Sequence, residues 1–217
     1  MKFNKINMEQ WNRREHFEHY FKHVKCGFSI TKNIDITKLL TMSKAKEFAF
    51  YPLVLYMASV GVNAQMELRT YVNEAGEVGY WEQVHPSYTI FHKDTHTFSE
   101  LWTEYSKEFK VFYQNYKADM HLYGNNHSFF PKKDCPLNSF PVSCIPWSSF
   151  SGFNLNLLGD NQFLSPIITF GKYFKVGDTV QLPVSVQIHH AAADGYHVSQ
   201  FLAELQKLVL TTEEWLL

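Results

Sequence analysis

Residues 187–197, Gln187-Ile-His-His-Ala-Ala-Ala-Asp-Gly-Tyr-His197, are the most informative part of the sequence. A run rich in β-branched residues predicts a strand that ends at the two histidines, and apolar residues at helical spacing follow. The alanines leave space beside the imidazole of His190, and Asp194 stands where a helix begins, a position that favours negative charge. The same residues also suit an ordinary strand followed by an N-capped helix, so residue types alone leave both interpretations open.

Strands and helices flank this stretch without strict β-α-β alternation. Apolar residues at helical spacing predict helices over residues 9–24, 37–45, 51–65, 98–122 (the longest) and 196–210. Runs of alternating or β-branched residues predict strands over residues 27–31, 68–72, 78–82, 88–92, 142–147, 153–157, 167–173 and 179–189. We therefore expect an α+β fold, a two-layer sandwich with helices packed on a mixed β-sheet. Because no internal repeat or linker is evident, residues 1–217 are expected to form a single domain.

Composition argues against several classes of protein. Of the 217 residues, 45% are apolar and 19% are charged, which suits a chain with a large core and not a disordered one. Lys plus Arg number 20 against 21 Asp plus Glu, a balance that does not suit a protein that binds nucleic acid by neutralising phosphates. The 19 Phe, 12 Tyr and 5 Trp exceed what one core needs, so some rings are expected to line a pocket or a subunit interface.

Cysteine usage and the apolar runs predict where the protein works. Cys26, Cys135 and Cys144 form no C-x-x-C pair and are odd in number, which argues against a disulfide framework and a structural zinc site. Reduced thiols suit the cytosol. The first residues lack an apolar signal-peptide segment, and the longest apolar run, residues 51–64, is too short and too broken to cross a bilayer. We expect a soluble cytoplasmic protein with no membrane partner.

Several kinds of catalytic site were weighed against the sequence. A metal site could draw on two histidine-containing clusters, which are His189, His190, Asp194 and His197, and His16, His19 and His23. Neither contains H-E-x-x-H or lies close to a cysteine in sequence, so we expect no metal. Cys144 has no His or cationic neighbour that would activate it as a nucleophile. The sequence also lacks a G-x-S-x-G nucleophile elbow and the common glycine-rich phosphate loops.

The stretch 187–197 resembles the active-site signature of the chloramphenicol acetyltransferase family. Further resemblances fall in the expected order along nearly the whole chain, at Trp11-Asn-Arg-Arg-Glu-His-Phe17, Ile34-Asp-Ile-Thr37, Phe50-Tyr-Pro52, Gly79-Tyr-Trp81, Phe129-Phe-Pro131, Ser143-x-x-Pro-Trp147, Phe153-Asn-Leu-Asn156 and Pro166-Ile-Ile-Thr169. The departures are small: Ala192 and Ala193 stand where many members have Val and Cys, and Ile145 where several have Asn. None of them removes a titratable group that the chemistry needs.

The resemblance implies a role for each matching polar residue. His190 would be the general base that takes the proton of the primary 3-hydroxyl of chloramphenicol, which then attacks the thioester of acetyl-CoA directly. Ser143 would donate to the tetrahedral oxyanion, and Thr169 would stabilise the intermediate through water. Asp194 would pair with Arg13 and hold the loop that aims His190. The product is an inactivated antibiotic, so the family confers antibiotic resistance.

The resemblance also implies the binding surfaces and the assembly. The acceptor pocket would be walled by Tyr20, Phe28, Phe98, Phe130 and Leu155, and the coenzyme A channel by Tyr51, Trp147 and Tyr173. Acetyl-CoA would be a co-substrate, with no permanently bound cofactor. The protein would be a homotrimer with its active sites at the subunit interfaces.

Other readings of the same motif remain. Condensation domains of peptide synthetases and dihydrolipoyl acyltransferase cores share His-x-x-x-Asp-Gly, but the first are about twice as long and the second usually follow lipoyl segments, which favours the antibiotic-modifying family. A related acyltransferase with a different acceptor stays open. A catalytically silent trimer that sequesters hydrophobic ligands is the third hypothesis, and the intact His190, Asp194 and Ser143 argue against it.

Overall fold

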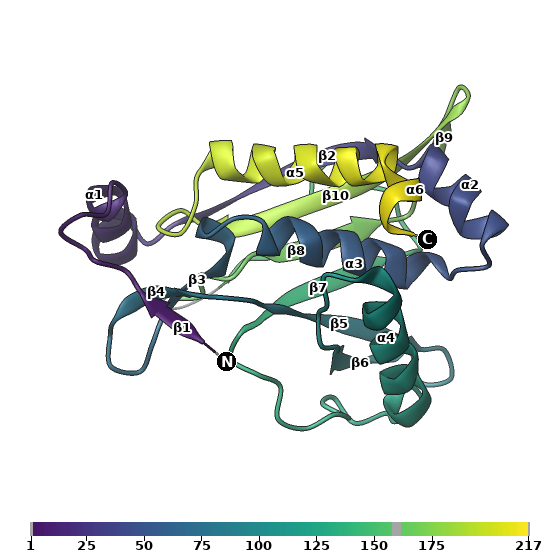
Figure 1. Cartoon of the computed structure of the whole chain (residues 1–217), viewed down its shortest axis with the longest axis horizontal. Helices are drawn as coiled ribbons and strands as arrows, with labels where there is room; N and C mark the ends of the chain where they lie inside the picture. The colour runs from purple at the N-terminus through teal and green to yellow at the C-terminus, as the bar shows by residue number, and fades with distance from the viewer. Residues whose placement is uncertain (1, 158–161, 217) are drawn as a thin grey trace.

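Helices pack on a mixed β-sheet in the computed structural model, which describes residues 2–157 and 162–216 (Figure 1). This arrangement confirms the expected fold class. Within that part of the chain the main sheet has seven strands, in the order β2 (Gly27–Asp35), β10 (Thr179–His189), β8 (Ile167–Gly171), β7 (Ser139–Ile145), β5 (His85–His92) and β6 (Thr97–Trp102), with β9 (Phe174–Val176) also paired to β10. The β8–β7 and β7–β5 pairs are parallel and the others are antiparallel.

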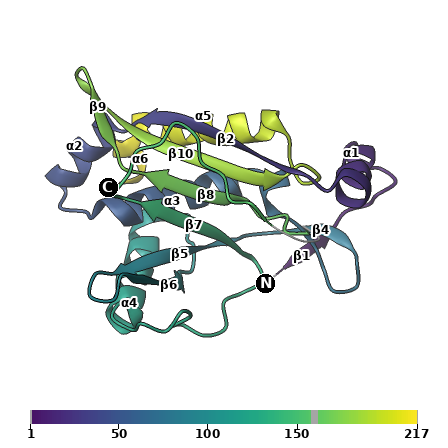
Figure 2. The same cartoon turned by 180° about the vertical axis from the view of Figure 1, so that it is seen from behind.

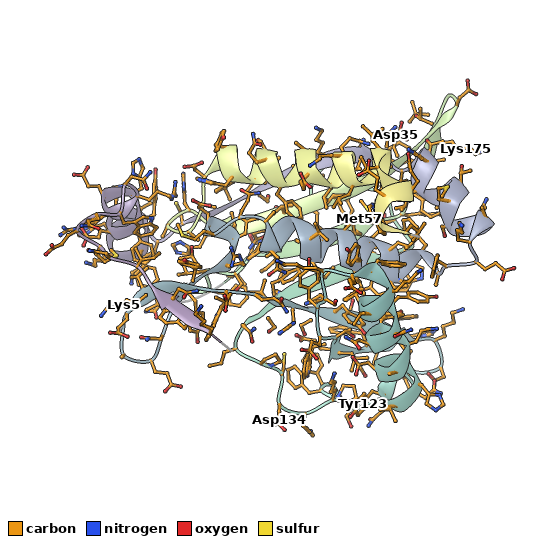
Figure 3. All side chains as sticks on the ribbon, viewed as in Figure 1. Lys5, Asp35, Met57, Tyr123, Asp134 and Lys175 are labelled. Atoms are coloured by element: carbon orange, nitrogen blue, oxygen red, sulfur yellow. The ribbon has the colours of Figure 1, made fainter. Side chains whose placement is uncertain are left out.

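Two long helices, α3 (Phe50–Asn63) and α5 (Gly195–Leu210), cover one face of this sheet (Figure 1). Helix α3 is apolar almost throughout because nearly all of it is buried, as Met57 at the middle of the molecule illustrates (Figure 3). Helix α5 is amphipathic and turns one apolar stripe to the core, formed by Val198, Phe201, Leu202, Leu205, Leu208 and Val209. The other helices beside them are α2 (Thr37–Ala45), α4 (Phe109–Tyr123) and α6 (Thr212–Trp215). No helix in the described residues is long and apolar enough to cross a membrane.

The N-terminal part of the chain lies at the end of the sheet where β10 ends (Figure 1). It contains a small sheet of β1 (Phe3–Lys5), β4 (Val78–Trp81) and β3 (Thr70–Val72), with the short helix η2 (Glu67–Arg69) before β3. The helix expected over residues 9–24 begins only at Arg14 as α1 (Arg14–Glu18) and widens into a π-helix, η1 (His19–Val24). Lys25 ends it in the left-handed conformation.

The helix predicted over residues 98–122 is wrong in its first part and is confirmed from Phe109 onward. Its first part is strand β6, in which Ser99 and Leu101 are buried, and Thr103 just beyond the strand is buried too, a spacing of two that belongs to a strand. Strand β6 pairs with β5, and the helix begins only at Phe109. Leu101 and Tyr105 are four residues apart, which imitates helical spacing across the junction and explains the error.

The other face of the sheet carries no helix among the described residues, and the segment after β7 crosses it (Figure 2). The strand predicted over residues 153–157 is wrong, since none forms there. The backbone of this segment is bound by side chains of the sheet and not by a strand. Leu155 donates to Gln187 Oε1 at 2.6 Å, Gln187 Nε2 donates to the Leu155 carbonyl at 2.6 Å, and Ser185 Oγ donates to the Phe153 carbonyl at 2.5 Å.

Packing between α3 and α5 predicts the effect of one added methyl group. A Cβ placed on Gly61 would lie 2.7 Å from Cε2 of Phe201, whose ring is fully buried. Gly61→Ala should therefore lower the free energy of unfolding by about 1–3 kcal/mol, measured by urea denaturation. Gly152→Ala is the control, because an added Cβ there meets nothing within 4 Å. Equal stability of Gly61→Ala and the unchanged protein would contradict this packing.

Candidate active site

The last residues of β10 place His190 between two aromatic rings. Strand β10 stays paired with β2 up to His189, which lies opposite Gly27, and His190 N then donates to the Cys26 carbonyl at 2.9 Å. The Tyr20 ring from η1 stacks on the imidazole of His190, with centroids 3.9 Å apart and planes 7° apart. Phe28 on β2 meets the same imidazole edge-on at 5.1 Å. The structure thus brings Tyr20 and Phe28, two of the expected acceptor-pocket residues, to the expected base.

The turn after His190 is buried and short. Ala191, Ala192 and Ala193 are 0% exposed, so the turn is packed within the protein. Ala191 N donates to Nδ1 of His189, which fixes the start of the turn. Nδ1 of His190 is buried without a hydrogen-bond partner among residues 2–157 and 162–216. The other ring nitrogen, Nε2, is therefore the one left to meet an incoming group.

Asp194 joins this turn to α5 and to the N-terminal helix. Its Oδ1 accepts from Tyr196 N at 3.1 Å and its own N–H donates to Nδ1 of His197 at 3.2 Å, so it caps α5. Its Oδ2 accepts from Nη1 of the buried Arg13 at 2.6 Å. Burial opposes ionisation of the carboxyl, but the Arg13 hydrogen bond and the nearby His197 outweigh it and hold the pKa of Asp194 below its usual value.

A large apolar cavity of about 720 Å³ lies at another part of the same sheet. Its wall includes six of the expected site residues, which are Tyr51, Phe98, Ser143, Trp147, Leu155 and Tyr173. Expected acceptor-pocket residues and expected coenzyme A residues therefore share one cavity, with Ser143 among them. The cavity is of the size that holds drug-like ligands.

Burial sets the ionisation of two groups on the cavity wall. Burial raises the pKa of the Cys144 thiol to about 11, so the thiol is neutral near pH 7 and a poor nucleophile. The Tyr51 hydroxyl donates to the Thr89 carbonyl at 3.2 Å, and burial raises its pKa well above the usual value. Neither group supplies charge to the cavity.

Besides the five expected residues in and around the His190 turn, two more expected site residues, Thr169 and Phe130, do not line this cavity. Thr169 is buried on β8 and lies opposite Ser143 on β7. Phe130 is 48% exposed and touches Phe129, which in turn touches the cavity residue Phe98. Sequence reasoning missed Phe91, Tyr116 and Met120, which do line the cavity. Phe91 lies opposite Phe98 in the β5–β6 pair. This pairing could not be predicted while residues 98–122 were assigned to a helix.

Strand register places Ser143 and His190 far apart within one chain. Ser143 lies opposite Thr169, and Thr169 lies opposite Ser185, five residues before His190 along β10. With about 3.3 Å per residue along a strand and about 4.8 Å between strands, the Cα atoms of Ser143 and His190 are about 19 Å apart. Side chains at that separation cannot both touch one carbonyl group, so a site that uses both needs two chains.

Among residues 2–157 and 162–216, no group of three or more His, Cys, Asp or Glu side chains is arranged to hold a metal ion. The ring centroids of His19 and His23, on the N-terminal helix, are 6.4 Å apart.

Comparison with known proteins places this geometry in a family. The family model described as "Chloramphenicol acetyltransferase" matches residues 1–206. The chain belongs to the chloramphenicol acetyltransferase family. It is therefore an acyltransferase. A chloramphenicol acetyltransferase of Clostridium butyricum is 49% identical over 216 residues, covering 100% of this chain and 99% of that protein. One from Staphylococcus aureus is 44% identical over 216 residues and both chains are covered fully.

Solved structures agree on the fold. A chloramphenicol acetyltransferase structure superposes with a TM-score of 0.88 at 21% identity, covering 96% of this chain and 100% of that chain. A dihydrolipoamide acetyltransferase of Azotobacter vinelandii superposes with a TM-score of 0.63 at 15% identity, covering 94% of this chain and 88% of that chain. At these identities the likeness concerns the fold alone, and the identification of the family depends on the sequence matches.

Gln187 gives a test of how the cavity wall is held. Gln187→Leu keeps the size of the side chain but removes both hydrogen bonds to Leu155, so the free energy of unfolding should fall by about 1–2 kcal/mol. Amide hydrogen exchange at Leu155 should rise at the same time. Gln181→Leu on the same strand is the control, because the Gln181 amide donates to the side chain of Thr179, two residues away. Unchanged exchange at Leu155 would refute this account of the wall.

Proposed function

We propose that this protein is a chloramphenicol O-acetyltransferase, which moves the acetyl group of acetyl-CoA to the primary 3-hydroxyl of chloramphenicol and so inactivates the antibiotic. The observation that carries the proposal is the 44–49% identity, over the full chain, to relatives of that name. The residues that such chemistry requires, His190, Ser143 and the Asp194–Arg13 pair, are all present.

His190 acts as the general base in this proposal. The neutral imidazole carries its proton on Nδ1, which is buried, and Nε2 takes the proton of the 3-hydroxyl. The oxygen then bonds to the carbonyl carbon of acetyl-CoA. When the tetrahedral intermediate collapses, the carbon–sulfur bond breaks, and the proton on His190 passes to the departing thiolate. The stacked Tyr20 ring keeps the imidazole in place throughout.

Polar groups around the intermediate stabilise its charge. Ser143 donates its hydroxyl to the oxyanion, and Thr169, opposite it on the next strand, acts through a water molecule. The Arg13–Asp194 pair holds the turn that aims His190, and Asp194 takes no proton in the reaction. These roles leave the chain without need of a permanently bound cofactor.

The binding surfaces divide between acceptor and donor. Phe98 and Leu155 wall the acceptor end of the cavity, and Tyr20, Phe28 and Phe130 supply the remaining aromatic surface for the nitrophenyl ring. The coenzyme A molecule lies along three other residues that line the cavity, Tyr51, Trp147 and Tyr173. Ser143 belongs to the same wall, close to the point at which acetyl group and hydroxyl would meet.

A homotrimer with shared active sites completes the proposal. The separation of about 19 Å between Ser143 and His190 in one chain supports a site in which His190 of one subunit faces the cavity of its neighbour. Large apolar side chains near the cavity are 46–60% exposed on the single chain, namely Phe98, Phe129, Phe130, Trp147 and Leu155. A neighbouring subunit would cover them. Each subunit is one domain spanning residues 1–217 and works in the cytoplasm, where acetyl-CoA is made.

Turnover and its dependence on His190 test the reaction. The protein should release free coenzyme A thiol from acetyl-CoA only when chloramphenicol is present, and His190→Ala should reduce the rate by about 10²–10⁴ or more, because no other base is placed to replace it. An analogue with fluorine in place of the 3-hydroxyl has no proton to give and should inhibit competitively without being acetylated. Acetylation of that analogue, or an active His190→Ala variant, would contradict the mechanism.

Hybrid trimers test whether the sites are shared. His190→Ala removes the base, and Leu155→Trp fills the cavity, so each homotrimer should be inactive. In a mixed trimer, one interface joins an intact His190 to an intact cavity, so purified hybrids should recover about a third of the unchanged activity per trimer. Tags of two kinds on the two variants would isolate the hybrids. Inactive hybrids, or an active monomer in sedimentation, would exclude the shared site.

A further inference from the structure

A hydrogen-bonded chain of polar side chains, three of them buried and Lys132 partly buried, lies behind the cavity wall and takes no part in the proposed chemistry. Lys132, in the connection 124–138 that follows α4, donates to Asp119 Oδ1 on α4 at 2.7 Å. Thr103, just after β6, donates to Asp119 Oδ2 at 2.8 Å, and its hydroxyl lies 2.8 Å from that of Tyr88 on β5. Tyr88 and Thr103 are fully buried and Asp119 is 8% exposed.

The hydrogen bonds of this chain have one consistent direction. A threonine hydroxyl has a single hydrogen, and Thr103 gives it to Asp119, so the Tyr88 hydroxyl must donate to Thr103. Burial raises the pKa of Tyr88 well above its usual value, which keeps that proton in place. The Asp119 carboxylate thus accepts from Thr103 on one oxygen and from Lys132 on the other.

Lys132 ties the connection 124–138 to the body of the protein. Its ammonium lies 3.7 Å from the centroid of the Trp102 ring and donates to the Trp102 carbonyl at 3.2 Å. The first half of the same connection is held differently, through the Ser99 hydroxyl near the carbonyls of Asn126 and Ser128. Tyr123 and Asp134, near the two ends of the connection, lie at the same edge of the molecule (Figure 3).

Two members of this chain, Asp119 and Tyr88, lie beside residues that line the cavity. Asp119 stands on α4 between Tyr116 and Met120, which line the cavity. The Tyr88 ring packs against Tyr116 at 5.7 Å and against Tyr51, another wall residue, at 5.9 Å. The polar chain and the cavity wall are therefore in contact through Tyr88 and helix α4.

Stability alone does not explain a buried ion pair at this place. The cost of removing two charges from water offsets most of their attraction. Apolar residues of similar size in place of such a pair often stabilise a core to the same degree. A pair of this kind does specify one geometry, because both carboxylate oxygens and the ammonium must be satisfied together. Here the specified geometry is that of α4 relative to β6 and to the connection that carries Phe130.

We propose that Lys132 and Asp119 are positioning residues for acceptor binding: they act through Tyr116, Met120 and the segment around Phe130 to hold the acceptor side of the cavity in its binding shape. The inference rests on the proposed acetylation of chloramphenicol. It concerns binding and not chemistry, since neither residue reaches His190 or Ser143.

Steady-state kinetics of Lys132→Met and Lys132→Arg test the proposal. Lys132→Met should raise KM for chloramphenicol about tenfold, with kcat and KM for acetyl-CoA within about twofold of the unchanged enzyme. Lys132→Arg should restore the chloramphenicol KM to within about threefold, because a guanidinium can bind the carboxylate and stack on Trp102. Lys133→Met, at the exposed neighbouring position, is the matched control and should change nothing.

The outcomes separate this proposal from the proposed function. If the unchanged protein does not acetylate chloramphenicol, the function is refuted and this inference falls with it. If it does and Lys132→Met leaves the chloramphenicol KM unchanged, this inference alone is overturned. An equal loss of kcat in both Lys132 variants would also overturn it, since that marks a general disturbance.

A second variant covers the case in which Lys132→Met does not fold. Thr103→Val keeps the shape of the side chain and removes the hydroxyl between Tyr88 and Asp119. It should raise the chloramphenicol KM about threefold or more at unchanged kcat, and amide hydrogen exchange in residues 116–120 should rise. Unchanged KM and exchange in Thr103→Val would overturn the proposal.

Discussion

The ion pair between Arg13 and Asp194 is the interaction on which the rest of the site depends. It joins residues 181 positions apart, and it fixes the N-terminal helix against the start of α5. Tyr20 follows Arg13 within that helix, and His190 precedes Asp194 by one short turn. The ion pair thus sets the stacking of Tyr20 on His190. Strand pairing with β2 holds the other end of the same turn, so the imidazole is fixed from both sides.

Local sequence predicts those helices and strands in which the types of residue match the secondary structure that they form. Strand 179–189 and the helix after it are predictable because a run rich in β-branched residues ends at the histidines and apolar residues at helical spacing follow the turn. Residues 98–122 mislead because Leu101 lies in β6 and Tyr105 lies in the connection before α4, and yet the two are four residues apart. The backbone of residues 153–155 is bound by side chains of Ser185 and Gln187, which no local pattern reveals.

Family resemblance predicts which residues would serve the site, and their spatial grouping comes only from the structure. The Arg13–Asp194 pair is expected from the resemblance and is present, whereas the contacts of Tyr20 and Phe28 with His190 of the same chain are seen only in the structure. The distance between Ser143 and His190 depends on which residues lie opposite each other on β7, β8 and β10. It can be worked out only once the order of these strands is known. The buried contact of Lys132 with Asp119 was missed for a similar reason, because the connection 124–138 folds back on a helix that it has just left.

The wall segment 153–155 has a consequence for how proteins of this kind can diverge. A strand inside a sheet cannot slip by one residue without turning every side chain to the other face. A segment tethered by Thr31, Ser185 and Gln187 is free of that restriction, since each tether can be exchanged by itself while β2 and β10 keep their register. Natural selection can therefore reshape the pocket in single substitutions and leave the scaffold intact. Each exchange costs the stability of the hydrogen bonds that it removes, but the strand register on which the rest of the sheet depends stays unchanged.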